Sequence, residues 1–442
     1  MKKLFLFLAV ILINLSLRIY ISINTPHQGD ILTQQEWANT LTNQGLAGSY
    51  FSQGWTYSPP TQPPLMMLAY SGSGWLYQNR NIFSAMHNFI KFPTAAMLLG
   101  FQKYGQTLSL KIWETIGTYF IALVFFFYLS KKNSFKKSFL CFLFIIFNPI
   151  SIFINSVWGQ NDILPTAFMY LAFIFVFSKF IFISPIFFVI GILFKPTIIT
   201  LIPLFAFIFL YQAFKKKAPH RIVNTIFSGL ICLGLIYFSF KPFIPSEIKP
   251  LGYINDIVNS RIKTSSKGLK LASVSAFNFY SLFWNIDKTY ATHDGSLIQL
   301  KDVATILIIL INFFFIFKLY KSKKINFDNT LFTIFFISQG SFLFMTNMLE
   351  RYFIPAFLSS IVLLVIYWKK FGLYFLVQNL IWLINIIYAY YYRNNDFINH
   401  LFHDYNNLLI RLLSLANLLL FLFITKTYFK SFLTRPLKSL DK

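Results

Sequence analysis

An aspartate and two cations stand out in this chain because each lies next to an apolar segment. Asp30 follows the first hydrophobic stretch and opens a polar one, Lys195 precedes Pro196, and Arg351 follows Glu350 at the start of another apolar stretch. A carboxylate can act as a general base, and Lys and Arg suit phosphate or developing negative charge. These residue types indicate chemistry on an anionic substrate, provided that the fold brings them together.

A second polar group lies at residues 155–162, which read Asn-Ser-Val-Trp-Gly-Gln-Asn-Asp. Trp158 offers a flat face on which a sugar can stack, and Gln160 and Asp162 offer hydrogen-bonding groups for hydroxyls. Two simpler interpretations stay open. Tryptophan is common at membrane interfaces, and a lone arginine such as Arg351 is often an anchor for lipid headgroups.

Composition restricts the class of protein. The chain has 442 residues, of which 56% are hydrophobic, 20% aromatic and only 12% charged. A soluble domain could not solvate such a surface, so we expect an all-α polytopic membrane protein. The formal charge of +25 falls largely in short basic runs between apolar segments, so nucleic acid is not an expected partner. Cys141 and Cys232 lie inside apolar runs and are predicted to be packing residues.

The apolar segments predict about twelve transmembrane helices, since a helix needs about 20 residues to span the hydrocarbon core. The predicted spans are residues 4–23, 108–130, 138–156, 163–178, 182–195, 197–214, 222–240, 302–320, 328–346, 352–368, 371–391 and 405–425. Two of them, 163–178 and 182–195, are short and interrupted by proline. They are typical of broken or re-entrant helices that line a cavity.

Alternate connections are basic, with lysines at 131, 215, 318 and 369 among others, and this pattern predicts that they are cytoplasmic together with both termini. The opposite, outer side then receives two long loops, 24–107 and 241–301. We expect the function there, with the catalytic group in the first loop. No internal repeat or low-complexity linker divides the chain, so residues 1–442 are predicted to form one membrane domain.

Several blocks, taken in order, carry a family resemblance. They are Asp30, Tyr57-Ser58-Pro59-Pro60, residues 148–162, Phe194-Lys195-Pro196 and residues 350–355. Together they resemble the superfamily C (GT-C) integral-membrane glycosyltransferases that use polyprenyl-phosphate sugars. The likeness is strongest to mannosyltransferases related to the GPI mannosyltransferases, and it spans most of the chain.

The resemblance implies transfer of a hexose, mannose by family likeness, from a polyprenyl-phosphate donor at the outer membrane face. It implies that Asp30 is the catalytic base. The residues implied to bind substrate are Tyr57, Trp158, Gln160, Asp162, Lys195, Glu350, Arg351 and Tyr352. Two positions depart from the family pattern, because Ser58 interrupts the usual Tyr-Pro-Pro and Leu349 replaces a frequent histidine. These departures affect the sugar and the acceptor, which could be a glycolipid, a cell-wall glycan or a glycoprotein.

The chemistry is coherent without the family. A lipid phosphate is a good leaving group, so one carboxylate base suffices and direct displacement inverts the anomeric centre. His400, His403 and Asp404 offer too few ligands for a convincing metal site, and no cofactor is expected.

Two other functions stay open. A glycan polymerase or ligase would use a lipid-diphosphate donor and usually several outer arginines. A lipid or glycan transporter would place ionisable residues in the middle of its spans and often show a repeat. The predicted spans are nearly free of carboxylates, with Glu114 the clearest exception.

Overall fold

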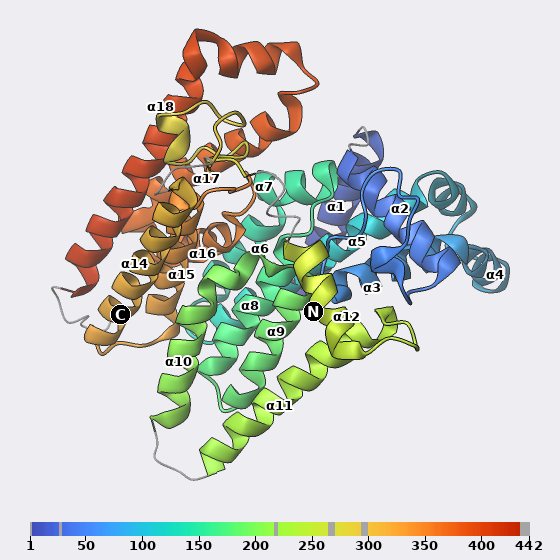
Figure 1. Ribbon diagram of the computed structural model, residues 1–442, viewed down its shortest axis with the longest axis horizontal. Coiled ribbons are helices and arrows are strands. Elements are labelled where there is room, and N and C mark those ends of the chain that lie inside the picture. Colours follow the sequence, from blue (N-terminus) through green and yellow to red (C-terminus); the bar gives the residue numbers. More distant parts are fainter. Residues whose placement is uncertain (1, 26–28, 216–219, 264–269, 293–298, 434–442) are drawn as a thin grey trace.

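The computed structural model describes residues 2–25, 29–215, 220–263, 270–292 and 299–433 (Figure 1). These residues form helices joined by turns and contain no β-strand beyond two isolated bridges. Three short stretches of the predicted outer loops, 26–28, 264–269 and 293–298, lie outside the described residues. The predicted all-α fold class is confirmed.

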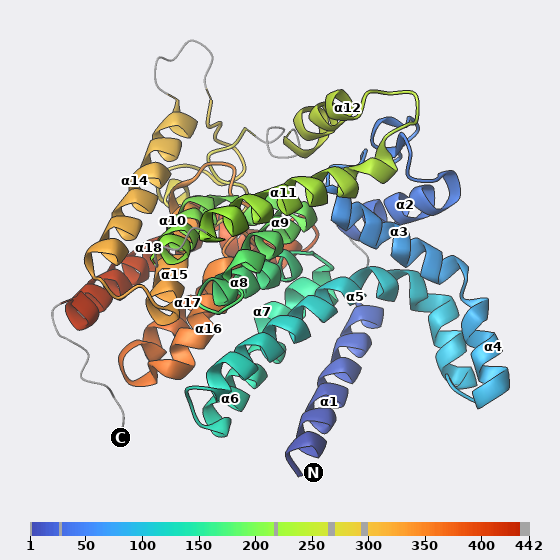
Figure 2. The same cartoon turned by 90° about the horizontal axis from the view of Figure 1, so that it is seen from below.

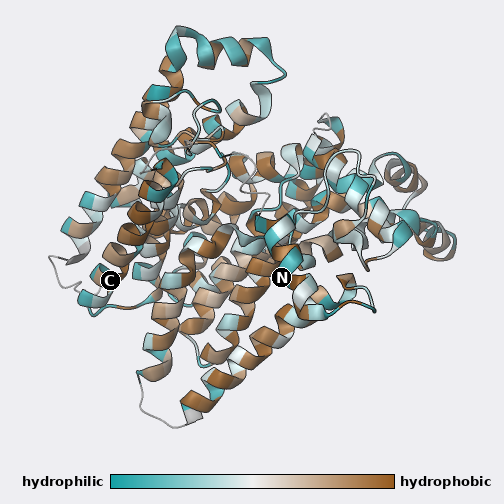
Figure 3. Cartoon of the chain, in the orientation of Figure 1, coloured by the Kyte–Doolittle hydropathy of each residue, from teal (hydrophilic) through white to brown (hydrophobic). Residues whose placement is uncertain are grey.

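Seven helices among the described residues are long and apolar enough to cross a membrane, and Figure 3 colours their many apolar residues brown. These segments are Lys3–Asn24 (in α1), Ala95–Ser130 (α5), Pro196–Phe214 (η4 and α10), Arg221–Phe243 (α11 with η5), Leu300–Lys321 (α14), Trp368–Tyr391 (α17) and Asp396–Ser431 (α18 with η8). The chain is therefore a multi-pass membrane protein, although twelve crossings are not confirmed.

Three of the predicted spans are too short to cross by themselves. They correspond to α8 (Ile163–Val176), α9 (Ser184–Phe194) and α16 (Ile354–Ile366). At about 1.5 Å per residue, even the longest of these covers only about two thirds of a hydrocarbon core about 30 Å thick. Most residues of α8 and α16 are buried inside the bundle, whereas α9 is only partly buried.

The predicted span at 138–156 is broken rather than continuous. Helix α6 (Phe135–Ile146) ends before Pro149, and the helical segment that follows, α7 (Pro149–Ile152) with η2 (Phe153–Trp158), is bent from it by 41°. Proline lacks the N–H that would continue the helix, and the Asn148 side chain accepts from Ile150 N at 2.9 Å to start α7.

The carbonyl left open at this break is bound by a buried arginine of α1 (Lys2–Asn24). Arg18 Nη2 donates to the oxygen of Ile146 at 2.7 Å, and Asn14 Nδ2 donates to the same oxygen at 2.9 Å. A helix end without backbone partners is costly in an apolar surrounding, so this contact both satisfies α6 and fixes α1 against it.

The first predicted outer loop, 24–107, is mostly helical in the structure. It contains α2 (Gly29–Gln44), α3 (Pro64–Gln78), α4 (Asn81–Ile90) and the first turns of α5. The buried residues of α2 form one stripe along the helix: Ile31, Gln34, Trp37, Ala38 and Leu41. The other residues of α2 are mostly polar, so the composition of the segment did not indicate an amphipathic helix.

The two long segments predicted to lie outside, 24–107 and 241–301, pack against each other. Trp37 and Tyr50 from the first share a hydrophobic cluster with Phe243, Tyr253 and Ile257 from the second, and Gly48 N donates to Phe243 O at 2.9 Å. Helix α12 (Pro250–Ile257) thus lies near α2 and α3, at the end of the molecule that Figure 2 shows at upper right. This packing is what holds α2 in place above the bundle.

The main core is built around α15 (Phe327–Phe344) and α16, whose side chains are nearly all buried. Closer to the site, α5 crosses α8 at Gly117, where an added Cβ would lie 2.7 Å from Leu164 Cα. The backbones of these two helices approach so closely that only glycine fits.

We predict that Gly117→Ala lowers stability by about 1–3 kcal/mol, because the methyl group would force α5 and α8 apart. Thermal unfolding in detergent measures the change. Gly100→Ala is the matched control in the same helix, since no atom lies within 4 Å of its added Cβ. Equal melting temperatures for the two variants would contradict the close approach.

Candidate functional site

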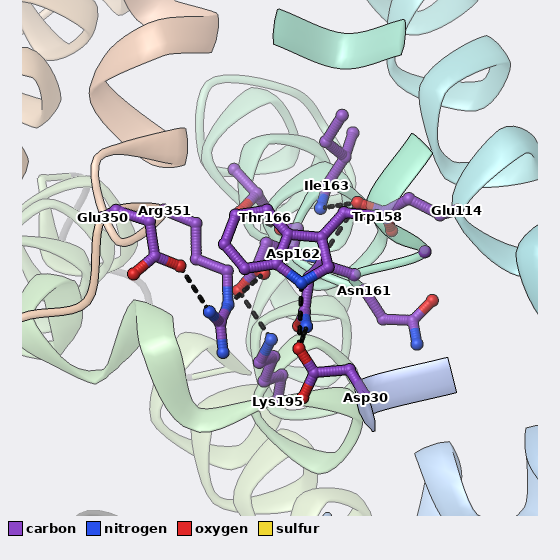
Figure 4. Close-up of polar contacts among 12 residues, drawn as sticks. Asp30, Glu114, Trp158, Asn161, Asp162, Ile163, Thr166, Lys195, Glu350 and Arg351 are labelled. Carbon is purple, nitrogen blue, oxygen red and sulfur yellow. Dashed lines mark hydrogen bonds and ion pairs between the residues drawn. The ribbon is translucent and has the colours of Figure 1, made fainter. Parts of the chain in front are cut away.

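Asp30 lies in the first turn of α2, and its carboxylate contacts the end of η2 and the turn that follows it (Figure 4). Its Oδ2 accepts from Trp158 Nε1 at 2.9 Å and from Gln160 Nε2 at 2.7 Å. Gly159, between these two donors, has φ of 79°, and an added Cβ would lie 2.2 Å from Ile31 Cδ1. The glycine therefore allows both donors to reach one carboxylate oxygen while α2 packs against the turn.

The second carboxylate of the site, Asp162, lies between two cations. Its Oδ1 is 2.8 Å from Lys195 Nζ, and its Oδ2 is 3.3 Å from Arg351 Nε. Arg351 Nη1 is in turn 2.6 Å from Glu350 Oε1. The Asp162 side chain is 2% exposed, so the ion pairs are shielded from water and the two carboxylates balance the two cations.

The Arg351 and Glu350 pair lies in the turn between α15 and α16. Burial raises the pKa of Glu350, and the adjacent guanidinium opposes that rise. Burial alone would lower the pKa of Arg351, but the charges of Glu350 and Asp162 outweigh burial and raise it above its usual value. Arg351 is therefore a permanent cation, fixed by two carboxylates.

Glu114 of α5 positions this network through the backbone. Its carboxylate accepts from the backbone N–H groups of Asp162 at 2.9 Å, of Ile163, and of Leu164 at 3.1 Å. These are the orphan donors at the start of α8, where a negative charge is also favoured by the helix dipole. In the sequence Glu114 was conspicuous as a lone carboxylate inside an apolar segment, but nothing there indicated that it would bind the backbone at the start of α8.

A small polar pocket of about 70 Å³ lies where these groups meet. Its walls are formed by Asp30, Thr33, Gln34, Trp37, Gln62, Tyr70, Gln160, Asn161, Lys195 and Arg351. The residues come from α2, the turn before α3, α3 itself, the turn before α8, the end of α9 and the turn before α16. The structure thus brings the predicted aspartate and both predicted cations to one cavity.

The other predicted site residues occupy different places. Trp158 lies beside the pocket with its ring 5.6 Å from the Arg351 guanidinium, and Tyr352 contacts the same guanidinium at 5.9 Å. Asp162 and Glu350 hold the cations from behind and do not line the cavity. Tyr57 is 52% exposed and does not line the pocket.

Six pocket residues were missing from the predicted site: Thr33, Gln34, Trp37, Gln62, Tyr70 and Asn161. Those on α2 follow Asp30 at helical spacing, a pattern that would have been visible had the segment been predicted as a helix. Gln62 and Tyr70 depend on the packing of α3 against α2, for which the sequence gives no local signal. At this contact an added Cβ on Gly74 would lie 2.5 Å from Ala38 O.

The histidines near the N-terminal end of α18 (Asp396–Tyr428) do not form a metal centre in the described part of the chain, where no three His, Cys, Asp or Glu side chains are grouped. His400 Nδ1 is 3.4 Å from Asp404 Oδ1. His403 contacts the Tyr388 hydroxyl at 3.1 Å and Asn407 Oδ1 at 2.7 Å. These contacts connect α17 with the non-helical turn inside α18.

Comparison with protein-family models gave no match, and comparison with curated protein sequences gave none either. Fold and composition define the class: an all-helical, multi-pass membrane protein. Within that class the pocket, with its carboxylate and two cations, is the feature from which a function can be argued.

One wall of the pocket depends on a turn at residues 52–63, which side chains of α2 and the side chain of Tyr50 hold. Trp37 Nε1 donates to Ser58 O at 2.7 Å, and the Tyr50 hydroxyl donates to Gln62 O at 2.7 Å. Glu36 accepts from the backbone N–H of Thr56 at 2.5 Å and of Tyr57 at 3.0 Å.

We predict that this turn loosens in acid. Slight burial opposes the shift, but the N–H groups of Thr56 and Tyr57 lower the pKa of Glu36 below its ordinary 4.5. A lowered folded-state pKa gives stability that is present above the unfolded-state pKa and lost as pH falls through the folded value. Protection of residues 52–63 against hydrogen exchange should therefore decline below about pH 4.5.

Glu36→Gln is the control for this measurement, because an amide cannot titrate. Its protection at residues 52–63 should be lower than that of the wild type at neutral pH and should not change on acidification. The same acid-induced decline in both proteins would exclude Glu36 as the cause.

Proposed function

We propose that this protein is a membrane glycosyltransferase that moves a hexose from a polyprenyl-phosphate donor to an acceptor hydroxyl, with Asp30 as the general base. One observation carries the proposal. A carboxylate and two fixed cations, Asp30, Lys195 and Arg351, line the same small polar pocket of a membrane protein although they lie far apart in the sequence.

The proposed reaction is a direct displacement. The acceptor oxygen forms a bond to the anomeric carbon, the bond from that carbon to the phosphate oxygen breaks, and its electron pair leaves with the lipid phosphate. The acceptor proton passes to Asp30. No protonation of the leaving group is needed, so a single carboxylate is enough and the anomeric centre is inverted.

The geometry of Asp30 supports this role. Its Oδ2 is occupied by the two donors Trp158 and Gln160, whereas its Oδ1 accepts no hydrogen bond from the described residues. The two fixed contacts orient the carboxylate, and the free oxygen is available for the acceptor hydroxyl. Orientation of a base in this way reduces the entropic cost of reaching the transition state.

Lys195 and Arg351 are the proposed phosphate ligands. Both line the pocket while Asp162 and Glu350 hold them from the side away from it. Lys195 retains ammonium protons for further acceptors, and Arg351 Nη2 has no acidic partner among the described residues. Cations that are fixed before the reaction can stabilise the departing phosphate without reorganisation.

The donor and the sidedness belong to the proposal as well. A lipid-linked donor suits a pocket in a protein with several apolar spans, since the lipid part can stay in the bilayer. Mannose as the sugar, the outer face as the side of reaction and cytoplasmic termini rest on the resemblance to GT-C enzymes and on the basic connections. The acceptor is proposed to be a glycolipid, a cell-wall glycan or a glycoprotein.

We expect Asp30→Asn to lower sugar transfer about 100- to 10,000-fold, because asparagine cannot take the acceptor proton. The assay is transfer of radiolabelled sugar from synthetic polyprenyl-phosphate-mannose, -glucose and -galactose into membrane lipids by purified protein. Melting temperature should change little, since an amide oxygen can still accept from Trp158 and Gln160.

Asp256→Asn is the matched control, because this aspartate is exposed on α12 and outside the pocket. It should transfer sugar at the wild-type rate. Full activity of a folded Asp30→Asn protein would remove the base from the proposal. Transfer from polyprenyl-diphosphate sugars alone would identify a polymerase or ligase instead, and no transfer from any donor would favour a transporter.

A further inference from the structure

The wall of the pocket next to Asp30 carries two amide oxygens that have no hydrogen-bond partner. They are Oε1 of Gln34 and Oδ1 of Asn161, on side chains of residues that are 5% and 4% exposed. Leaving a buried polar atom unpaired costs about 1–3 kcal/mol. Such atoms at the wall of a pocket point to a ligand that supplies donors.

The contacts that the two amides make leave their oxygens as the unpaired atoms. Gln34 Nε2 donates to Gly159 O at 3.2 Å, and Asn161 Nδ2 donates to the Tyr70 hydroxyl at 2.8 Å. Turning the Gln34 amide around would place its oxygen against the carbonyl oxygen of Gly159, whereas the Tyr70 hydroxyl could contact either end of the Asn161 amide. The pocket therefore presents two acceptors on one side.

The surroundings of these acceptors suit a neutral polyol. The indole N–H of buried Trp37 is bound to Ser58 O, so Trp37 lines the pocket with its ring. This ring lies 5.8 Å from the ring of Tyr70. Thr33 and Gln62 add short polar groups. An aromatic surface with amides around it is a typical combination for sugar recognition, because the apolar ring faces stack while the hydroxyls bind.

The two cations and the sugar-binding candidates of the pocket come from different elements of the fold. Lys195 and Arg351 come from the turns that follow α9 and precede α16, whereas Gln34, Trp37 and Tyr70 come from α2 and α3. Asp30 belongs to α2 as well. A phosphate on the cations and a hexose among the amides would place the anomeric carbon between them, within the reach of Asp30.

We infer that Gln34 and Asn161 form the subsite for the transferred hexose and accept hydrogen bonds from two of its hydroxyls. This inference rests on the proposed function, and it adds the residues that discriminate among donor sugars. A donor without one of the two hydroxyls leaves a buried oxygen unpaired, so the subsite selects sugars by the positions of their hydroxyls.

The test compares binding of polyprenyl phosphate with binding of polyprenyl-phosphate-mannose, -glucose and -galactose by the full chain in nanodiscs. Wild type should bind at least one sugar-bearing lipid about tenfold or more tightly than the bare lipid, since two hydrogen bonds at about 1 kcal/mol each exceed the 1.4 kcal/mol that a tenfold change requires. Gln34→Met and Asn161→Leu should each reduce that gain about fivefold and leave binding of the bare lipid unchanged.

Gln35→Met is the matched control, because this neighbouring residue of α2 donates to the Thr107 hydroxyl and does not line the pocket. Gln35→Met should bind the sugar-bearing lipid more tightly than the bare lipid by the same factor as the wild type. Donors that lack single hydroxyls give a second readout. Wild type should bind two of them more weakly than the complete donor, and Gln34→Met should stop discriminating against one of these.

Equal binding of sugar-bearing and bare lipids by wild type would overturn the subsite, and so would the same loss in Gln35→Met as in Gln34→Met. A gain seen only with a free methyl hexoside, and with no donor lipid, would overturn it too by assigning the amides to the acceptor. If the protein transfers sugar but binds sugar-bearing lipids no more tightly than the bare lipid, the proposed subsite is wrong and the proposed reaction stands. If it binds sugar-bearing lipids more tightly but transfers no sugar, the proposed reaction is wrong and the subsite stands.

Discussion

The whole site depends on how one buried carboxylate, Asp162, is held. Its side chain joins Lys195 at the end of α9 to Arg351 before α16, and its backbone N–H is bound by Glu114 of α5. Four elements distant in the sequence are thereby fixed to one point. Breaking such a buried pair by removal of one partner costs about 3–5 kcal/mol, because the other charge is left uncompensated. The position of the cations is therefore set by the fold and does not depend on a ligand.

This arrangement explains why Asp30 and Asp162 have different environments, although both are carboxylates near the same cavity. Asp162 is neutralised by two cations and lies behind the pocket. Asp30 has only neutral donors, Trp158 and Gln160, and lines the pocket. One carboxylate organises charge and the other is available to a substrate, which is how a single base can work next to a phosphate site.

Much of the site could be predicted from the sequence because its chemistry-bearing residues stand at the ends of apolar segments. Asp30, Lys195 and Arg351 are conspicuous for that reason, and the pocket unites them. Their convergence could not be predicted from spacing, since it depends on α2 lying across the bundle. Gln34 and Tyr70 were missed because α2 is polar by composition and its buried stripe shows only once it is treated as a helix.

The fold class could be predicted from the sequence, but the number of membrane-spanning helices could not. Composition alone indicates an apolar helical bundle, and seven long apolar helices confirm it. Twelve apolar segments did not become twelve long helices, because an apolar run can be buried in protein as easily as in lipid. Helices α8 and α16 are mostly buried in protein, α9 is short and partly buried, and Pro149 divided a predicted span in two.

The ion pairs also bear on how this chain enters a membrane during synthesis. Asp162 and Lys195 flank α8 and α9, so the two ends of that hairpin carry charges of opposite sign, which can pair as the hairpin leaves the aqueous channel of the insertion machinery. Glu350 and Arg351 are neighbours in the chain and make a second pair. An unpaired charge in a bilayer is energetically costly. Each of these four groups has a partner of opposite charge close to it in the sequence, so none needs to stay unpaired in the bilayer until a distant segment is made.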